Sequence, residues 1–408
     1  MRWLFVFLVA CGAAVPALPS KGGPAWLELE TEHFTLWTDA GAAKGTELIE
    51  QMEYLHQIVF GVAFPDHPTG GRSFAVALRD DWEVHAYLPK EFSAISMLGY
   101  NAIREPVILF AADTDESDGH VLTHELAHVI SYVAIEEQPP WFAEGLAEFF
   151  EAVKLNTDKT VVDVGEPLNN QMYAQVHAHL VPGEQLFACR AVECRDHDFY
   201  MTAGLLFMYL ANTHPGQLLE LEDRLAKKED DRKAWAAVFP DLPLATIDRE
   251  LRTWQMQGRH RVWHFEVKLV HPQISQRPLG DSDVLAIRAF LTLKHEGVDP
   301  VAQKAIGEAL AADPTSVIAR MVEYTRAKKI TLDDARVVAK AHPDDWRAWF
   351  LVLAAHATGE ENHTAFERMC TLAAKNPANV YDRNNCSAHP LDPVPGGAED
   401  GNQSPTSK

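Results

Sequence analysis

The chain has 408 residues, more than one ordinary domain holds, so we expect two or three domains. Apolar residues make up 47% of it and charged residues 23%, which is typical of a soluble globular protein. The net charge of −22 argues against a nucleic-acid partner, because such a partner needs basic patches.

Residues 1–20 predict an export signal. Arg2 precedes an apolar run over residues 3–15 that is too short to span a bilayer comfortably, and small residues and prolines follow it. Cleavage after Ala17 suits an ordinary signal peptidase, whereas "LVAC" ending at Cys11 resembles a bacterial lipobox, which would place a lipid on this cysteine. We expect an exported protein that is periplasmic, in the cell envelope or secreted, and that contacts a membrane only if lipid-anchored through Cys11.

The next hundred residues predict a small sheet and a helix. Alternating aromatic and β-favouring residues predict a strand over residues 26–39, and an apolar stripe at helical spacing predicts a helix over about 41–60. "RSFAVALRD" and "REPVILFAAD" predict two more strands, over residues 72–80 and 104–113. Pro106 favours an edge position for the last of these, because proline cannot donate to a sheet ladder.

Three helices are expected next. "HVLTHELAHVISY" (residues 120–132) predicts a helix that ends at the prolines after Gln138, and a second helix begins near Trp141 with "WFAEGLAEFFEAVKL". After a loop-rich stretch, "FYMTAGLLFMYLANTH" (residues 199–214) predicts a strongly apolar helix, and helical sequence continues to about residue 261.

Residues 281–386 predict an all-helical region. Pro314, Pro343 and Pro377 each stand in a turn that ends one helix and begins another, a pattern that loosely resembles tetratricopeptide-type helical hairpins. An irregular helical bundle explains the pattern equally well. Residues 387–408 are rich in Pro, Gly, Ser and Asn, so we expect a disordered tail.

The cysteines predict two local disulfides. Export would remove Cys11 and leave four cysteines in an oxidising compartment, where close pairs form bridges. We expect Cys189 to pair with Cys194 and Cys370 with Cys386. A zinc site built from all four is the alternative, although their spacing suits one poorly.

The motif "HELAH" predicts a zinc site. His124 and His128 lie four residues apart, so on a helix they share a face and can bind one ion, with Glu125 beside it as a base. A catalytic zinc takes three protein ligands and leaves one position for water, whose pKa then falls to about 7. The alternative is a helix whose His128 is satisfied in the core and whose His124 is exposed.

A third ligand has to come from another segment. Glu144 and Glu148 lie four residues apart in a strongly apolar stretch, and Glu151 follows them. Buried carboxylates need partners, and a metal ion is one such partner.

"HELAH" followed by "PPWFAEGLAEF" resembles the gluzincin metallopeptidases, in particular the peptidase-MA-like group of exported bacterial proteins. The resemblance covers about residues 26–256 and implies an α+β fold: a zincin-like domain over residues 26–262, with a small sheet, an edge strand and active-site helices. It implies that Glu144 is the third ligand and that Glu148 supports a ligand histidine. The spacing departs from the family, because Glu148 has the usual distance from His128, so Glu148 stays the alternative ligand.

The resemblance also implies a reaction. Peptide bonds would be hydrolysed by metal-activated water with Glu125 as general base and Zn²⁺ as cofactor, on a peptide or protein substrate added to an edge strand over residues 107–112. Tyr200 resembles the tyrosine that supplies the oxyanion donor. Other candidates for this donor are His177, His179 and His197.

Two other functions stay open. In one, the helical region over residues 281–386 binds a protein partner and the zinc site is structural or vestigial. In the other, the zinc site hydrolyses an amide that is not a peptide.

Overall fold

A computed structural model describes residues 15–65, 67, 72–89, 92–97, 106–113, 116–165, 179–258, 260–292, 300–373 and 386. The predicted export signal up to residue 14, its Cys11, the tail over residues 387–408 and His177 lie outside the described residues. The chain divides into two compact units, and the division falls between Pro278 and Leu279. The first unit therefore extends beyond residue 262, where the sequence places the end of the first domain.

The fold mixes helices and strands. The strands are β1 (Trp26–Glu30), β2 (Phe34–Thr38), β3 (Ser73–Leu78), β4 (Ala94–Met97), β5 (Val107–Ala111), β6 (Lys154–Leu155), β7 (Val161–Val164), β8 (Trp263–Glu266) and β9 (Ser275–Leu279). The helices of the first unit are α1 (Ala42–Ala63), α2 (Asp81–Val84), α3 (Glu116–Ala134), α4 (Pro140–Glu151), α6 (Gly183–Leu186), α7 (His197–Thr213), α8 (Pro215–Ala226), α9 (Asp231–Val238) and α10 (Ile247–Met256). Short 3₁₀ turns lie at Pro19–Lys21, Val192–Cys194 and Leu244–Thr246.

The larger sheet has the strand order β4-β5-β3-β2-β1-β9. Strands β2, β3 and β5 run parallel, while β1 and β4 pair antiparallel with their neighbours. The segment over residues 26–39 is therefore a hairpin rather than the single strand that its alternation predicts. The amide of Thr31 donates to the carbonyl of Phe34 across the turn.

Among the described strands the edges of this sheet are β4 and β9, so the prediction that residues 107–112 form the edge strand is wrong. Strand β5 lies between β4 and β3. Pro106 does not exclude this place, because it precedes the strand and its carbonyl accepts a hydrogen bond of 2.8 Å from the amide of Phe74. A missing donor at the entrance of a strand costs no ladder bond.

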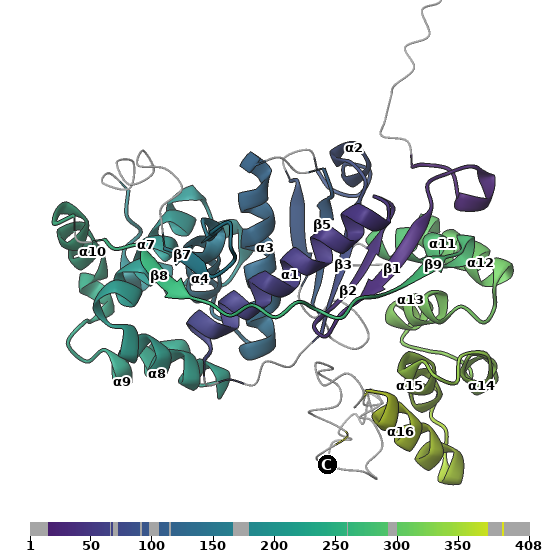
Figure 1. Cartoon of the computed structure of the whole chain (residues 1–408). Coiled ribbons are helices and arrows are strands. Elements are labelled where there is room, and N and C mark those ends of the chain that lie inside the picture. Colours follow the sequence, from purple (N-terminus) through teal and green to yellow (C-terminus); the bar gives the residue numbers. More distant parts are fainter. Residues whose placement is uncertain are drawn as a thin grey trace, which may run out of the picture. The chain divides into compact units, whose positions relative to one another are not determined.

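Helices α1 and α3 pack against the larger sheet and against each other. Strands β2, β3 and β5 are buried throughout, and their apolar side chains join those of both helices in one core. The chain between β8 and β9 runs along α1 (Figure 1), where Gln57 exchanges hydrogen bonds with the backbone of Val270. This connection carries β9 to the sheet from far along the sequence.

A second sheet, β6-β7-β8, is antiparallel, and its last strand follows the helical segment that the sequence predicts to about residue 261. Within the described part of the chain, no helix combines the length and apolarity that crossing a membrane requires.

The second unit is helical where it is described. Its helices are α11 (Asp281–Leu291), α12 (Pro300–Ala312), α13 (Val317–Ala327), α14 (Leu332–Ala341), α15 (Trp346–Ala354) and α16 (Gly359–Ala373). Pro314 and Pro343 stand between helices, as predicted, and Pro377 lies outside the described residues. The structure joins Cys370 to Cys386, and in the first unit Cys189 to Cys194, the two pairs expected from their spacing.

Candidate metal centre

Helix α3 presents two different faces. Leu126, Ala127, Val129 and Ile130 are buried in the core of the first unit. His124 and His128 share another face, where α3 packs against α4. The apolar spacing of the helix thus fixes the direction of both imidazoles, since side chains four residues apart lie one above the other.

Three side-chain atoms converge between α3 and α4. The Nε2 atoms of His124 and His128 lie 3.2 Å apart. Oε2 of Glu144 lies 3.4 Å from Nε2 of His124 and 3.1 Å from Nε2 of His128. These three atoms therefore form a nearly equilateral triangle.

Glu148 and Glu151 lie on the opposite edge of the His124 ring. Oε1 of Glu148 is 4.0 Å from Nδ1 of His124, and Oε2 of Glu151 is 3.8 Å from the same nitrogen. Glu144 thus shares the Nε2 side with both histidines, while the other two carboxylates face Nδ1. This separation gives the two glutamates that the sequence leaves as alternatives two different positions.

A close helix crossing holds Glu144 in place. Helix α4 packs against α7, and a Cβ atom at Gly145 would stand 2.7 Å from the carbonyl oxygen of Ala203 and 3.0 Å from Cβ of Phe207. Only glycine allows this approach without a shift of one helix. The glycine of "WFAEGLAEF" therefore positions the residue before it.

The cluster concentrates negative charge around the histidines. Burial lowers the pKa of His124, but the carboxylates of Glu144 and Glu151 outweigh it and raise this pKa to about 10. Burial raises the pKa of Glu144, but His124 and His128 hold it well below its ordinary value. Burial and the charge of Glu151 raise the pKa of Glu148 to about 8. Protons on His124 and Glu148 thus offset the negative charge of the carboxylates, and a bound metal cation could take the place of these protons.

Glu125 of α3 contacts the edge strand β4, and its charge acts on His124. Its Oε2 accepts a hydrogen bond of 2.7 Å from the backbone amide of Ser96, in the middle of β4. The predicted base is thus tied to the edge of the sheet.

Arg195 is a site residue that the sequence did not reveal. Its Nη1 donates to Oε1 of Glu144 at 3.3 Å, so Glu144 is held on one oxygen by Arg195 while the other faces the histidines. Arg195 directly follows Cys194 of the disulfide and precedes Asp196, whose side chain caps α7. The only feature of the sequence that could have indicated Arg195 is its place between a disulfide cysteine and the residue that caps α7.

Tyr200 stands in the first turn of α7 and is half-buried. Burial raises its pKa, and so do the charges of Glu144 and Glu125, against the effect of Arg195. The phenol therefore lies within the electrostatic reach of the cluster. His179 and His197 are exposed.

Zinc fits the donor set. Ligands about 2.0–2.1 Å from a tetrahedral zinc stand about 3.3–3.4 Å from one another, and the three atoms here are 3.1–3.4 Å apart. Two imidazoles and one carboxylate are ligands that zinc takes in catalytic sites. No family model and no curated protein matches the chain.

Proposed function

We propose that the protein is an exported zinc metallopeptidase of the gluzincin type, with a zincin-like catalytic domain. The observation that supports it most is the triangle formed by His124, His128 and Glu144, whose edges of 3.1–3.4 Å suit one tetrahedral zinc. Glu148 and Glu151 face Nδ1 of His124 at 4.0 and 3.8 Å, and their charge favours a proton on this nitrogen, which leaves Nε2 free for the metal.

The roles of the residues follow from their places. Zinc bound here would supply Lewis acidity, which activates water and polarises a carbonyl. Glu125 takes the proton of the attacking water on its carboxylate and passes it to the leaving amine. Tyr200 donates a hydrogen bond from its phenol to the oxyanion, and Arg195 keeps Glu144 in position.

The substrate would add to β4. The outer side of an edge strand can pair with an extended peptide, and on β4 the Ser96 amide holds Glu125 beside this path. A scissile bond bound in this way would lie beside the proposed base. The two disulfides support an oxidising compartment and therefore export.

Glu125→Gln tests the proposal. The variant should keep its zinc, because Glu125 is no ligand, and should lose about 100-fold or more of its rate on an unfolded protein substrate. Glu136→Gln is the matched control, since Glu136 lies just beyond α3 and pairs with Lys228 on the surface. Hydrolysis that is unchanged in Glu125→Gln would contradict the proposal.

A further inference from the structure

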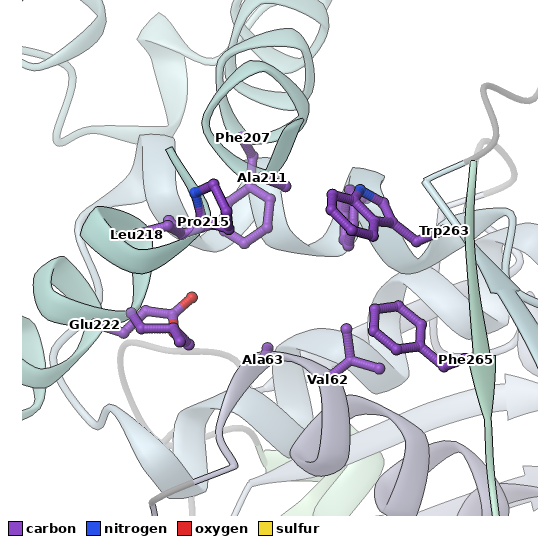
Figure 2. A pocket seen from close by; sticks show the side chains of 11 residues that line it. Val62, Ala63, Phe207, Ala211, Pro215, Leu218, Glu222, Trp263 and Phe265 are labelled. Carbon is purple, nitrogen blue, oxygen red and sulfur yellow. The ribbon is translucent and has the colours of Figure 1, made fainter. Parts of the chain in front are cut away.

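The first unit contains a small apolar pocket, built by α1, α4, α7, α8 and β8 (Figure 2). Its volume is about 190 Å³. A dry cavity of about 150 Å³ is large enough for benzene, whereas drug-sized ligands need about 300 Å³ or more. The pocket therefore suits a ligand with a body of about one aromatic ring.

Strand β8 supplies one wall because its side chains alternate. Trp263 and Phe265 face inward, and their partners Val164 and Val162 in β7 are buried. His264 is exposed on the other face. Figure 2 shows both aromatic rings of β8 across the pocket from α8.

A glycine keeps another ring at the pocket. Gly165 has a φ of +78°, and a Cβ atom there would stand 2.7 Å from the ring of Phe149. Phe149 and Phe207 both line the pocket and contact each other as a tilted pair. Aromatic faces thus reach the pocket from α4, α7 and β8.

One acid stands in this apolar wall. Glu222 is only 1% exposed, and its Oε2 has no hydrogen-bond partner among the described residues. Figure 2 shows its carboxyl group at the pocket, opposite the aromatic side chains of β8. A buried carboxyl group with an unpaired oxygen is unfavourable, so a ligand that donates to this group is favoured.

The one ionisable residue of the lining indicates the charge of the ligand. Of the 11 described residues that line the pocket, Glu222 alone has an ionisable side chain. An acid among aromatic faces suits an organic cation, because the carboxylate pairs with it and the rings attract it. The net charge of −22 also draws cations toward the protein.

We propose that this pocket binds a small organic ammonium ion, with an apolar body of about one ring and a primary amine that pairs with Glu222. This site is separate from the proposed zinc centre and needs no metal. In the empty pocket, burial and the charge of Asp223 raise the pKa of Glu222 well above its ordinary value. Binding of the ammonium therefore displaces the carboxyl proton into solvent.

Calorimetry of the full chain with 2-phenylethylammonium tests the site, with and without a zinc chelator. We expect one saturable site per chain in both conditions. Glu222→Gln keeps the shape of the side chain but cannot ionise to pair with the ammonium, so it should weaken binding about tenfold or more. The uncharged analogue 2-phenylethanol should bind the wild type and this variant equally.

Glu220→Gln is the matched control on the same helix. Glu220 pairs with Arg224 at the surface, so this variant should bind both probes as the wild type does. Equal ammonium affinity in wild type and Glu222→Gln would overturn the proposal, as would the absence of saturable binding at millimolar concentration.

Proton release gives a second measurement that needs no variant. Titrations in two buffers of different ionisation enthalpy should show a net release of protons on ammonium binding, because the raised pKa of Glu222 falls when its carboxylate pairs with the cation. The charge of Asp223 helps to raise the pKa of Glu222, and Oδ1 of Asp223 lies 3.2 Å from Nε2 of His67. His67→Gln leaves the charge of Asp223 in place, so proton release on ammonium binding should persist in this variant. No proton release in the wild type would overturn the proposal.

Discussion

Gly145→Ala tests whether the crossing of α4 and α7 positions the metal centre. The new methyl group would stand 2.7 Å from the carbonyl oxygen of Ala203 and 3.0 Å from Cβ of Phe207. Neither neighbour is the far end of a flexible side chain, so the two helices have to separate. Glu144, one residue away, moves with α4.

The expected size follows from two opposing effects. Alanine is favoured over glycine in a helix by about 1 kcal/mol. Overpacking a buried contact costs about 1–3 kcal/mol, so the net free energy of unfolding should fall by up to about 2 kcal/mol. In a unit of this size each kcal/mol shifts the melting temperature by roughly 2–4 °C. The shift of Glu144 should weaken zinc binding by about tenfold or more.

Calorimetric melting of the metal-free protein and competition with a chromophoric zinc chelator measure both effects. Gly61→Ala is the control, because Gly61 lies in α1 and a Cβ there meets nothing within 4 Å. It should raise stability by about 0.5–1 kcal/mol and leave zinc affinity unchanged. If Gly145→Ala melts as high as Gly61→Ala and binds zinc like the wild type, the reasoning is refuted.

Two further predictions concern pH and the disulfide. In the metal-free protein, the pKa of His124 is raised from about 6.5 in the unfolded chain to about 10 in the fold. The protonated imidazole therefore stabilises the fold fully below about pH 6.5, and this stability is lost as the pH rises through about 10. Melting from pH 6 to 10 should show this loss with chelator and not with saturating zinc, and a flat metal-free profile would contradict it. Replacing Cys189 and Cys194 by serine opens a loop with a sequence separation of 5, so urea unfolding should show a loss of about 2 kcal/mol. No loss in the urea midpoint would show that the loop is held by other contacts.

The sequence predicted much of the candidate site because its signals are local. His124, Glu125 and His128 share one helical segment, and helical periodicity alone places both imidazoles on one face. The choice between Glu144 and Glu148 depended on how α4 meets α3. The distances to Nε2 and Nδ1 of His124 separate them, and no spacing rule contains this information.

The parts that were missed depend on contacts far apart in the sequence. Strand β9 pairs with β1 but begins at residue 275, so the sequence near β1 does not indicate this neighbour. Pro106 pointed to an edge strand because proline lacks a donor, yet its carbonyl still pairs with Phe74. Arg195 reaches Glu144 only because the disulfide loop and the cap of α7 bring it there.

The metal content of the purified protein tests the central claim most directly. Elemental analysis should find about one zinc per chain in the wild type and none in His128→Ala. Glu144→Ala should also lose the metal, whereas Glu148→Gln should keep it, because Glu148 faces Nδ1 of His124 rather than the three converging atoms. A wild type without zinc, or a His128→Ala variant with as much zinc as the wild type, would contradict the account.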